Sequence, residues 1–376
     1  MLIKRRFDFV MPKRLPVTII TGFLGAGKTT LLRHLLKNSQ QRLAVMVNEF
    51  GSVGLDGDLI RGCGFCDDEG IEGRLVELNN GCLCCTVQDD FLPTIEKLLI
   101  RADLLDGIVI ETSGLALPKP LIQAIEWPQI RSKVFVNAVV TLVDSEALSL
   151  GSPVGDMKAL EKQRLEDESL DHLTPIQELF EDQLSSADIV LLTRSDLIDH
   201  NAITKLKQNI FKYLNDGTSV IPVANGQIDP PLILGVRNEN QNKGNLDHHD
   251  HDHDHDHDHD HDHDHDHDHD HDHDHVEAFS CSIKMELNIV QSEIEDFLLS
   301  LSKKHEILRL KGRLWLPKKA LPLQVQMVGP RISTWFEKAP DNVWRPNGGG
   351  GVELVILSLN EDLEEKISIL FANRFS

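Results

Sequence analysis

Apolar residues in the first two-thirds of the chain occur in short, nearly uninterrupted runs that alternate with helical patterns. Six of these runs are rich in β-branched residues, as expected for strands buried on both faces. The predicted strands are Val17–Thr21, Leu43–Val47, Ile108–Glu111, Val139–Asp144, Ile189–Thr193 and Val220–Ala224. Helices are predicted between them at Thr29–Leu36, Phe91–Ala102 and Pro175–Leu184. This alternation predicts an α/β fold with a doubly wound, mainly parallel sheet.

A second, smaller unit begins near Glu277, where the pattern changes to consecutive strands flanked by two helices. The expected strands are Ala278–Met285, Ile307–Leu316, Leu323–Val328, Ser333–Phe336 and Val352–Ser358. Amphipathic periodicity predicts helices at Val290–Lys303 and Leu363–Phe371. We therefore expect a C-terminal α+β domain of about 100 residues, a common size for one domain.

Two stretches interrupt these patterns. Asp156–Ser169 is strongly charged, which predicts an exposed helix or an insertion. Asn225–Leu246 turns polar and precedes a histidine-aspartate repeat, and both features indicate a linker. The expected organisation is an extension at 1–14, a P-loop domain at 15–235, a disordered linker at 236–276 and a C-terminal domain at 277–376.

The formal net charge of -22 comes mainly from one tract, residues 247–275, which holds 14 of the 60 acidic residues and no basic ones. Without it, 46 acidic residues stand against 38 basic ones, a net charge of -8. The chain shows no basic cluster, no apolar segment typical of a secretory signal and no run long enough to span a membrane. We expect a cytoplasmic protein that binds neither nucleic acid nor membrane.

The segment from Gly22 to Thr29, Gly-Phe-Leu-Gly-Ala-Gly-Lys-Thr, fits the G-x-x-x-x-G-K-[ST] phosphate loop and lies between a predicted strand and a predicted helix. Backbone N–H groups of such a loop and the helix N-terminus bind phosphates. Lys28 is expected to reach the β- and γ-phosphates, and the Thr29 hydroxyl to bind Mg²⁺. The expected nucleotide-binding residues are Gly22, Gly25, Ala26, Gly27, Lys28, Thr29 and Thr30.

A second nucleotide-binding element follows the predicted strand that ends at Thr193. The sequence Thr193-Arg-Ser-Asp196 stands where GTPases carry N/T-K-x-D. The Asp196 carboxylate would accept hydrogen bonds from guanine, which adenine cannot offer in that arrangement. Arg194 replaces the usual lysine, and its stem and planar guanidinium can still cover the base. The alternative is that Asp196 only caps the next helix.

Four segments resemble, in order and spacing, those of the CobW-type metal-handling P-loop GTPases. They are Gly22–Thr30, Asn48–Gly51, Gly81–Cys85 and Glu111–Gly114. The resemblance extends to the C-terminal domain through Leu310–Gly312. Two further segments, Val47–Asp56 and Val328–Arg331, are most similar to the branch that serves cobalamin synthesis.

This resemblance implies GTP hydrolysis coupled to the delivery of a transition metal to a client metalloenzyme. For the cobalamin branch, the metal would be cobalt and the client the cobaltochelatase of the corrin ring. Glu111 would lie near Mg²⁺ or its water ligands, and Gly114 would sense the γ-phosphate. Glu49 would contact the transported metal or the Mg²⁺ shell; the alternative is a solvated loop carboxylate.

Five of the six cysteines lie within 23 residues, a spacing that suits a metal or redox site better than a disulfide framework. Cys82, Cys84 and Cys85 can supply three thiolates, which suit Zn²⁺ and Co²⁺, and leave one position open for transfer. The alternative is a set of buried or redox-sensing thiols. Cys63 and Cys66 either complete such a site, form an entry site or take no part.

The tract from His248 to His275 contains 15 histidines that alternate with aspartates after the first pair. It has too few apolar residues to form a core, so we expect disorder. Imidazoles bind Zn²⁺, Co²⁺, Ni²⁺ and Cu²⁺, and the carboxylates raise the local cation concentration. The tract is interpreted as a metal collector, or alternatively as a repeat tolerated in a linker.

The leading hypothesis is a GTP-hydrolysing metallochaperone with GTP, Mg²⁺ and Co²⁺ or Zn²⁺ as its ligands, and cobalt as the favoured cargo. A zinc chaperone of the same family is the nearest alternative, because thiolate sites bind Zn²⁺ more tightly than Co²⁺. A passive metal buffer is a second alternative. An ATP-dependent small-molecule kinase is a third, which Asp196 and the cysteine segment disfavour.

Overall fold

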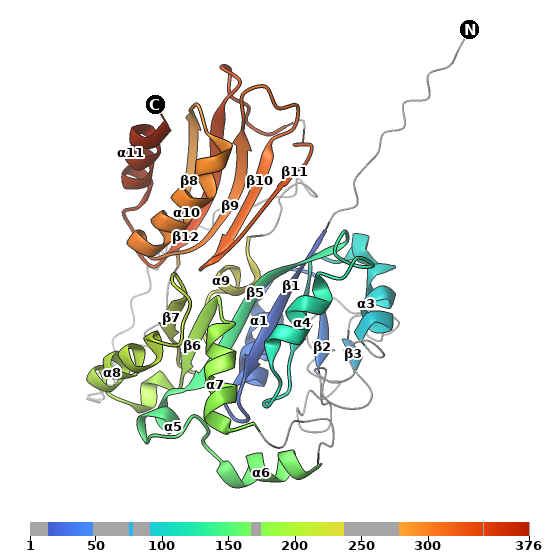
Figure 1. The fold of residues 1–376 in the computed structure, drawn as a ribbon, viewed down its shortest axis with the longest axis vertical. Coiled ribbons are helices and arrows are strands. Elements are labelled where there is room, and N and C mark those ends of the chain that lie inside the picture. Colours follow the sequence, from blue (N-terminus) through green and yellow to red (C-terminus); the bar gives the residue numbers. More distant parts are fainter. Residues whose placement is uncertain are drawn as a thin grey trace, which may run out of the picture.

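The computed structural model describes residues 14–47, 75–77, 91–166, 174–236, 278–340 and 342–375. These residues form two sheets with their own helices, and Figure 1 shows the C-terminal sheet lying at one end of the N-terminal strands. The N-terminal sheet has seven strands in the order β3-β2-β4-β1-β5-β6-β7, and every neighbouring pair is parallel. The strands are β1 (Leu15–Gly22), β2 (Leu43–Val47), β3 (Leu75–Glu77), β4 (Gly107–Glu111), β5 (Val134–Asp144), β6 (Ile189–Thr193) and β7 (Ser219–Pro222).

Helices cover both faces of this sheet, which confirms the doubly wound α/β fold expected from the alternating pattern. The α-helices are α1 (Lys28–Asn38), α3 (Leu92–Leu99), α4 (Pro118–Ile125), α5 (Ser145–Ser149), α6 (Met157–Glu166), α7 (Ile176–Ser185), α8 (His200–Phe211) and α9 (Pro230–Leu234). Two short 3-10 helices are η2 (Ala102–Leu104) and η3 (Ser195–Leu197). Helices α1 and α9 pack on one face, and α3, α4 and α7 pack on the other.

The expected linker at Asn225–Leu246 is wrong for its first part. Ile228 and the three apolar residues of α9 are at most 5% exposed and pack with α1 in the main apolar cluster. Pro230 and Pro231 stand in the first turn of α9, where the missing N–H costs no helical hydrogen bond. The polar residues around Pro230–Leu234 led to a linker prediction, but this segment forms a short buried helix that covers part of one face of the sheet.

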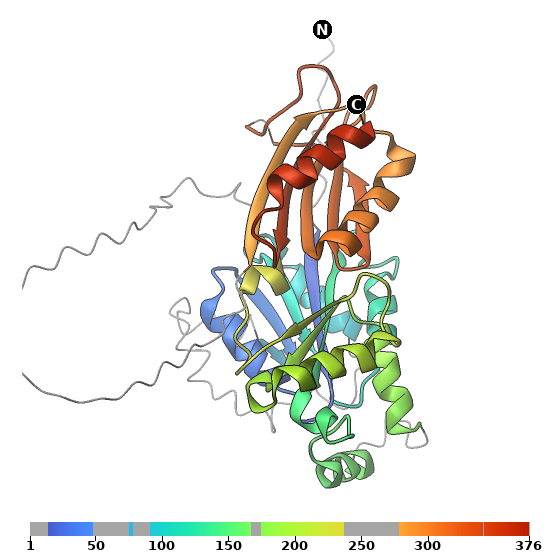
Figure 2. The same cartoon turned by 90° about the vertical axis from the view of Figure 1, so that its left-hand side faces the viewer.

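The C-terminal domain is an antiparallel sheet with two helices, as the sequence predicted. Its strand order is β11-β10-β9-β12-β8. The elements are β8 (Phe279–Glu286), α10 (Gln291–His305), β9 (Ile307–Trp315), β10 (Leu323–Val328), β11 (Arg331–Phe336), β12 (Gly351–Ser358) and α11 (Glu364–Phe375). Figure 2 shows α10 and α11 together on one face of this sheet. Cys281 of β8 is half-buried against the same core.

The other face of the C-terminal sheet contacts the N-terminal domain through a polar network around Asn137 of β5. Asn137 is 2% exposed, and its amide nitrogen donates to Thr18 Oγ1 at 2.8 Å. Its amide oxygen accepts from Arg309 Nη2 at 2.8 Å and from Gln326 Nε2 at 2.7 Å. Because Asn137 lies in the amino-terminal half of β5, the C-terminal domain docks at the sheet edge opposite the phosphate loop.

Asp188, just before β6, anchors the same interface. Its Oδ2 accepts from Arg331 Nε at 2.7 Å and from the backbone N–H of Val139 at 2.8 Å. Burial raises the pKa of Asp188, and Arg331 is the largest influence that opposes this rise. Arg309 is also fully buried, which lowers its pKa to about 9. The docked domains therefore enclose a cluster of charged side chains, in which Arg331 stabilises the buried charge of Asp188.

Among the described residues, no helix combines the length and the apolar character needed to cross a membrane.

Candidate functional site

The predicted site residues of the P-loop domain that the structure describes lie along one edge of the parallel sheet, where the strands end. Parallel strands share one direction, so their carboxyl ends meet at the same edge, the usual ligand-binding position in open α/β sheets. The strand-terminal residues are Gly22 of β1, Glu111 of β4, Asp144 of β5, Thr193 of β6 and Pro222 of β7. The structure thus brings together residues that lie up to 200 positions apart in sequence.

The phosphate loop follows β1 and depends on glycine at two positions. Gly22 has φ 135°, and a Cβ there would lie 2.4 Å from the carbonyl oxygen of Leu142. Gly27 has φ 91° and directly precedes α1. No side chain caps α1 within the described residues, and its first turn carries no acidic residue. The positive end of the helix therefore faces the loop without an acidic residue in its own first turn, which favours an anionic ligand.

Lys28 is folded back onto this loop. Its Nζ donates to the carbonyl oxygens of Gly22 at 2.8 Å and Phe23 at 3.0 Å. The residue as a whole is 8% exposed. Gly25 and Thr30 are exposed, whereas Ala26 is buried and its N–H donates to the Phe23 carbonyl. The ammonium group thus lies inside the loop, held by two backbone carbonyl oxygens.

Glu111 and Thr29 meet beside the loop. The Thr29 hydroxyl donates to Glu111 Oε1 at 3.1 Å. Glu111 is 7% exposed, and its second oxygen, Oε2, is buried without a hydrogen-bond partner among the described residues. Burial raises the pKa of Glu111, and the charge of Lys28 and the Thr29 hydrogen bond oppose that rise. A buried carboxylate oxygen without a partner, next to a threonine hydroxyl, fits the oxygen ligands that Mg²⁺ prefers.

Gly114 lies against the phosphate loop with no room for a side chain. A Cβ at Gly114 would be 2.7 Å from the backbone nitrogen of Leu24. The carbonyl oxygens of Gly114 and Ala116 both accept from Gln183 Nε2 of α7 at 3.2 Å. The backbone after β4 is therefore fixed against the phosphate loop.

The predicted base-reading element follows β6. Thr193 Oγ1 donates to the Ala26 carbonyl at 2.9 Å, which ties the end of β6 to the phosphate loop. Asp196 lies in η3 and is exposed. The alternative that Asp196 caps the next helix is wrong, because Asp199 caps α8 by accepting from the Ala202 N–H at 2.8 Å.

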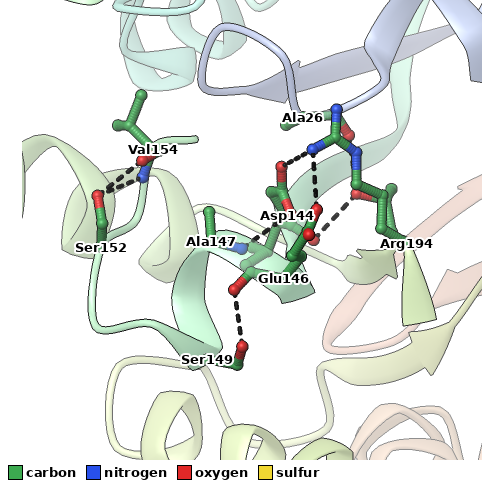
Figure 3. Close-up of polar contacts among 10 residues, drawn as sticks. Ala26, Asp144, Glu146, Ala147, Ser149, Ser152, Val154 and Arg194 are labelled. Carbon is green, nitrogen blue, oxygen red and sulfur yellow. Dashed lines mark hydrogen bonds and ion pairs between the residues drawn. The ribbon is translucent and has the colours of Figure 1, made fainter. Parts of the chain in front are cut away.

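Arg194 adopts a left-handed backbone conformation with φ 53°. Figure 3 shows its side chain pointing toward Asp144 and Glu146 of the neighbouring β5–α5 junction. The Nη1–Oδ2 distance to Asp144 is 2.8 Å, and the distance to Glu146 Oε2 is 3.5 Å. Sequence reasoning missed both acids, because Asp144 looked like the last residue of a strand.

The loop after β7 was also missed as part of this site. Asn225 and Gly226 both have positive φ, 50° and 68°, and a Cβ on Gly226 would lie 3.2 Å from Leu31 N and 3.3 Å from Thr30 Cγ2. The Ser195 N–H donates to the Val223 carbonyl at 3.4 Å, which places this loop beside the base-reading element. The Asn-Gly pair after a buried strand was the available signal for a tight turn.

The predicted metal ligands of the switch region lie outside the described residues. These are Cys82, Cys84, Cys85 and Glu49, together with Cys63, Cys66 and the histidine-aspartate tract. Within the part of the chain that the structure describes, no group of three histidine, cysteine or acidic residues is arranged to bind a metal.

The strands that flank these unplaced segments do have defined positions. Val47, the last residue of β2, is in register with Glu111 of β4 on one side and with Glu77 of β3 on the other. Residues 48–74 follow Val47, and residues 78–90 follow Glu77. Strands β2 and β3 therefore end at the edge of the sheet that carries Glu111.

Two family models match the chain. The model described as CobW/HypB/UreG, nucleotide-binding domain, matches residues 16–222. The model described as Cobalamin synthesis protein cobW C-terminal domain matches residues 279–373. The two matched ranges correspond to the parallel and the antiparallel sheet of the structure.

Two bacterial proteins are similar to this chain over nearly its whole length, and a fungal protein is similar over somewhat more than half of it. The Zinc chaperone CobW of Pseudomonas aeruginosa is 41% identical over 352 residues, covering 93% of this chain and 88% of that protein. The Zinc chaperone CobW of a Sinorhizobium species is 40% identical over 357 residues, covering 94% of each. The Zinc-regulated GTPase metalloprotein activator 1 of Schizosaccharomyces pombe is 36% identical over 218 residues, covering 57% of this chain and 47% of that protein.

Proposed function

Because this chain belongs to the CobW/HypB/UreG family of nucleotide-binding proteins, we propose that it hydrolyses GTP to time the delivery of zinc to a client metalloenzyme. The chain is a GTPase of a metallochaperone family. The observation that carries the proposal is the meeting of Lys28, Thr29 and Glu111 at the end of β1 and β4. These three residues provide a cation for the phosphates and oxygen ligands for a divalent metal.

Each residue of the phosphate loop has one role in this proposal. Glycines 22, 25 and 27 and Ala26 turn backbone N–H groups toward the phosphates, and Thr30 continues this set at the start of α1. The Lys28 ammonium leaves its two carbonyl partners and binds the β- and γ-phosphates. Thr29 and Glu111 hold Mg²⁺ or its water ligands. When bound, Mg²⁺ supplies neutralising charge to the phosphate oxygens.

Guanine selection is assigned to the loop after β6. Asp196 is exposed and has no hydrogen-bond partner among the described residues, so its carboxylate is available to accept from the N1–H and 2-amino group of guanine. Arg194 covers the face of the base with its stem and its planar guanidinium. Comparing GTP and ATP binding tests this assignment, and equal affinity for the two nucleotides would favour the kinase alternative.

The cargo site is assigned to the cysteine segment, with Cys82, Cys84 and Cys85 as thiolate ligands and Glu49 as an additional ligand. Strand β3, which precedes this segment, ends at the same sheet edge as Glu111, and this position of β3 supports a coupling between nucleotide state and metal affinity. We propose that the triphosphate-bound form holds the metal and that hydrolysis favours release. Gly114, fixed against the phosphate loop, is the residue that would transmit loss of the γ-phosphate.

Zinc is proposed as the cargo for two reasons. The relatives that match over nearly the whole chain carry the name zinc chaperone. Thiolate sites also bind Zn²⁺ more tightly than Co²⁺ in the general order of affinity. Cobalt for cobalamin synthesis, the first expectation from the sequence, is retained as the second candidate because of Val47–Asp56 and Val328–Arg331, and the cobaltochelatase would then be the client.

The histidine-aspartate tract at 247–275 is proposed to collect metal for the cysteine site, as part of a linker that joins domains at 15–235 and 277–376. The whole protein is proposed to work in the cytoplasm, where thiols stay reduced and available as ligands. A passive metal buffer would use the same tract but would not couple metal to nucleotide turnover.

The decisive experiment is GTP turnover of metal-free protein titrated separately with Zn²⁺ and Co²⁺. The proposal predicts that Zn²⁺ changes turnover of the wild type and that Cys84→Ser removes this response. Cys281→Ser, a half-buried thiol of the C-terminal domain, serves as the matched control and should respond as the wild type does. A response to Co²⁺ alone would replace zinc by cobalt, and indifference to both metals would contradict the chaperone function.

A further inference from the structure

Arg194 adopts a left-handed backbone conformation, which residues other than glycine rarely adopt. Its φ of 53° is one of four positive values among the described non-glycine residues, and arginine has no local side-chain hydrogen bond that favours it there. Such conformations persist where the surroundings fix them, and they gather at functional sites. The surroundings that fix Arg194 include two acidic side chains, Asp144 and Glu146.

Asp144 is the fixed partner of this arginine. The side chain of Asp144 is 4% exposed, whereas that of Arg194 is 48% exposed. One carboxylate oxygen of Asp144 accepts from the Ala147 N–H at 3.1 Å and so caps α5, and the other accepts from Arg194 Nη1 at 2.8 Å. The helix cap holds the carboxylate still, so the arginine is oriented by an immobile group. Glu146, 46% exposed and 3.5 Å away, adds a weaker contact.

The position of this pair relative to the phosphate loop is also defined. Asp144 is in register with Thr193, and Thr193 Oγ1 donates both to Ala26 of the loop and to Val143 of β5. Arg194, the next residue, therefore starts from a backbone that is tied to the phosphate site. At the start of η3, the Ser195 N–H donates to the carbonyl oxygen of Val223, just after β7.

From this geometry we infer that Asp144 is a positioning residue of the nucleotide site, which fixes Arg194 across the face of the guanine base. A lysine at position 194 would need no such partner, because an ammonium is a compact point charge on a flexible stem. A planar guanidinium covers a base only in one orientation, which the Asp144 carboxylate sets. The inference rests on the proposed guanine site and extends it to a residue on a different strand.

The inference predicts a nucleotide-binding defect that depends on the base. Asp144→Asn keeps an α5 cap, because asparagine caps helices as well as aspartate does, and removes only the charge that holds Arg194. Binding of GTP and of inorganic tripolyphosphate, each with Mg²⁺, is then measured on the full chain. We expect GTP affinity to fall roughly tenfold, the size of one lost charge-assisted hydrogen bond. Tripolyphosphate has no base, so its affinity should not change.

Two further variants complete the test. In an Arg194→Ala background, Asp144→Asn should cause no additional loss, because its effect passes through the arginine. Asp216→Asn removes an equal charge from an exposed pair with Lys303 and should bind both ligands as the wild type does. Unchanged GTP affinity in Asp144→Asn, or an equal loss of tripolyphosphate binding, would overturn the inference. If the wild type binds ATP as tightly as GTP, the proposed guanine site itself fails, whatever Asp144→Asn does.

Discussion

Replacing Gly114 by alanine tests the idea that the backbone after β4 senses the γ-phosphate. The added Cβ would lie 2.7 Å from Leu24 N and 3.2 Å from the Leu24 Cα and the Phe23 carbonyl carbon. An ordinary contact begins at 3.4 Å, so the shortest distance must grow by about 0.7 Å. All three atoms belong to the backbone, so no flexible side chain can absorb the change.

Either the phosphate loop or the backbone at Gly114 must therefore move by several tenths of an ångström. Misplacement of catalytic groups by about 1 Å costs roughly 100-fold in rate, so we expect GTP turnover of Gly114→Ala to fall between about 10-fold and 100-fold. GDP lacks the γ-phosphate, so its affinity should change much less. The loss should appear in kcat measured at saturating GTP, with GDP binding measured in parallel.

Gly348→Ala provides the matched control. This glycine lies in the C-terminal domain, and a Cβ there would meet only Glu286 Oε2 at 3.5 Å. Its turnover and melting temperature should match those of the wild type. Turnover of Gly114→Ala at the wild-type rate would refute the assignment of Gly114 as the γ-phosphate sensor, provided that the variant melts like the wild type.

The remaining predictions concern charge, docking and metal capacity. Glu111→Gln should weaken Mg²⁺-dependent GTP binding about 10–100-fold in titrations with and without Mg²⁺. Because burial raises the pKa of Glu111, binding in the wild type should fail with acid at a higher pH than an exposed glutamate predicts, and Gln should remove this step. Arg331→Met leaves the buried Asp188 without its closest cation and should cost about 3 kcal/mol in urea unfolding, whereas Lys303→Met, from an exposed pair, should leave the urea midpoint nearly unchanged. Deleting 247–275 should reduce the number of bound metal ions, measured by equilibrium dialysis, and leave GTP hydrolysis intact; loss of hydrolysis would contradict the linker-reservoir model.

The Glu111 and Arg331 predictions both have a direction in pH. A carboxyl whose pKa is raised on folding destabilises the folded protein once it is ionised. The nucleotide-free protein should therefore gain stability as the pH falls through the raised pKa of Glu111. In Arg331→Met, loss of the cation raises the pKa of Asp188 further, so its stability deficit should grow as the pH rises.

The strands were predictable because their sequences carry a strong physical signal. Leu43–Val47 and Ile189–Thr193 agree residue for residue with β2 and β6, since a strand buried on both faces is apolar throughout. The phosphate loop was equally predictable, because the local backbone conformation requires glycine at several of its positions. The contact between Glu111 and Thr29, 82 residues apart, follows from the parallel pairing of β1 with β4; the alternating pattern predicts parallel strands but not which strands pair.

Helices α4 and α9 were not among the predicted elements, and the segment that forms α9 was assigned to a linker. Both α4 and α9 start with prolines in the first turn, where proline fits well. Strand β3 has three residues, too few for any periodicity. The partners of Asn137 and Asp188 could not be predicted, because they arise only when two separately patterned domains dock. Asp144 had no signal either, since an aspartate that ends a strand commonly serves as a helix cap.

Control of metal affinity by the nucleotide state is measurable as Zn²⁺ competition between the protein and a chromophoric chelator. The protein should lack 247–275, so that the tract histidines do not compete, and should be saturated either with a non-hydrolysable GTP analogue or with GDP. The triphosphate-bound form should bind Zn²⁺ at least about tenfold more tightly than the GDP-bound form, within the usual range of coupling between two sites. Equal Zn²⁺ affinity in the two states would contradict it.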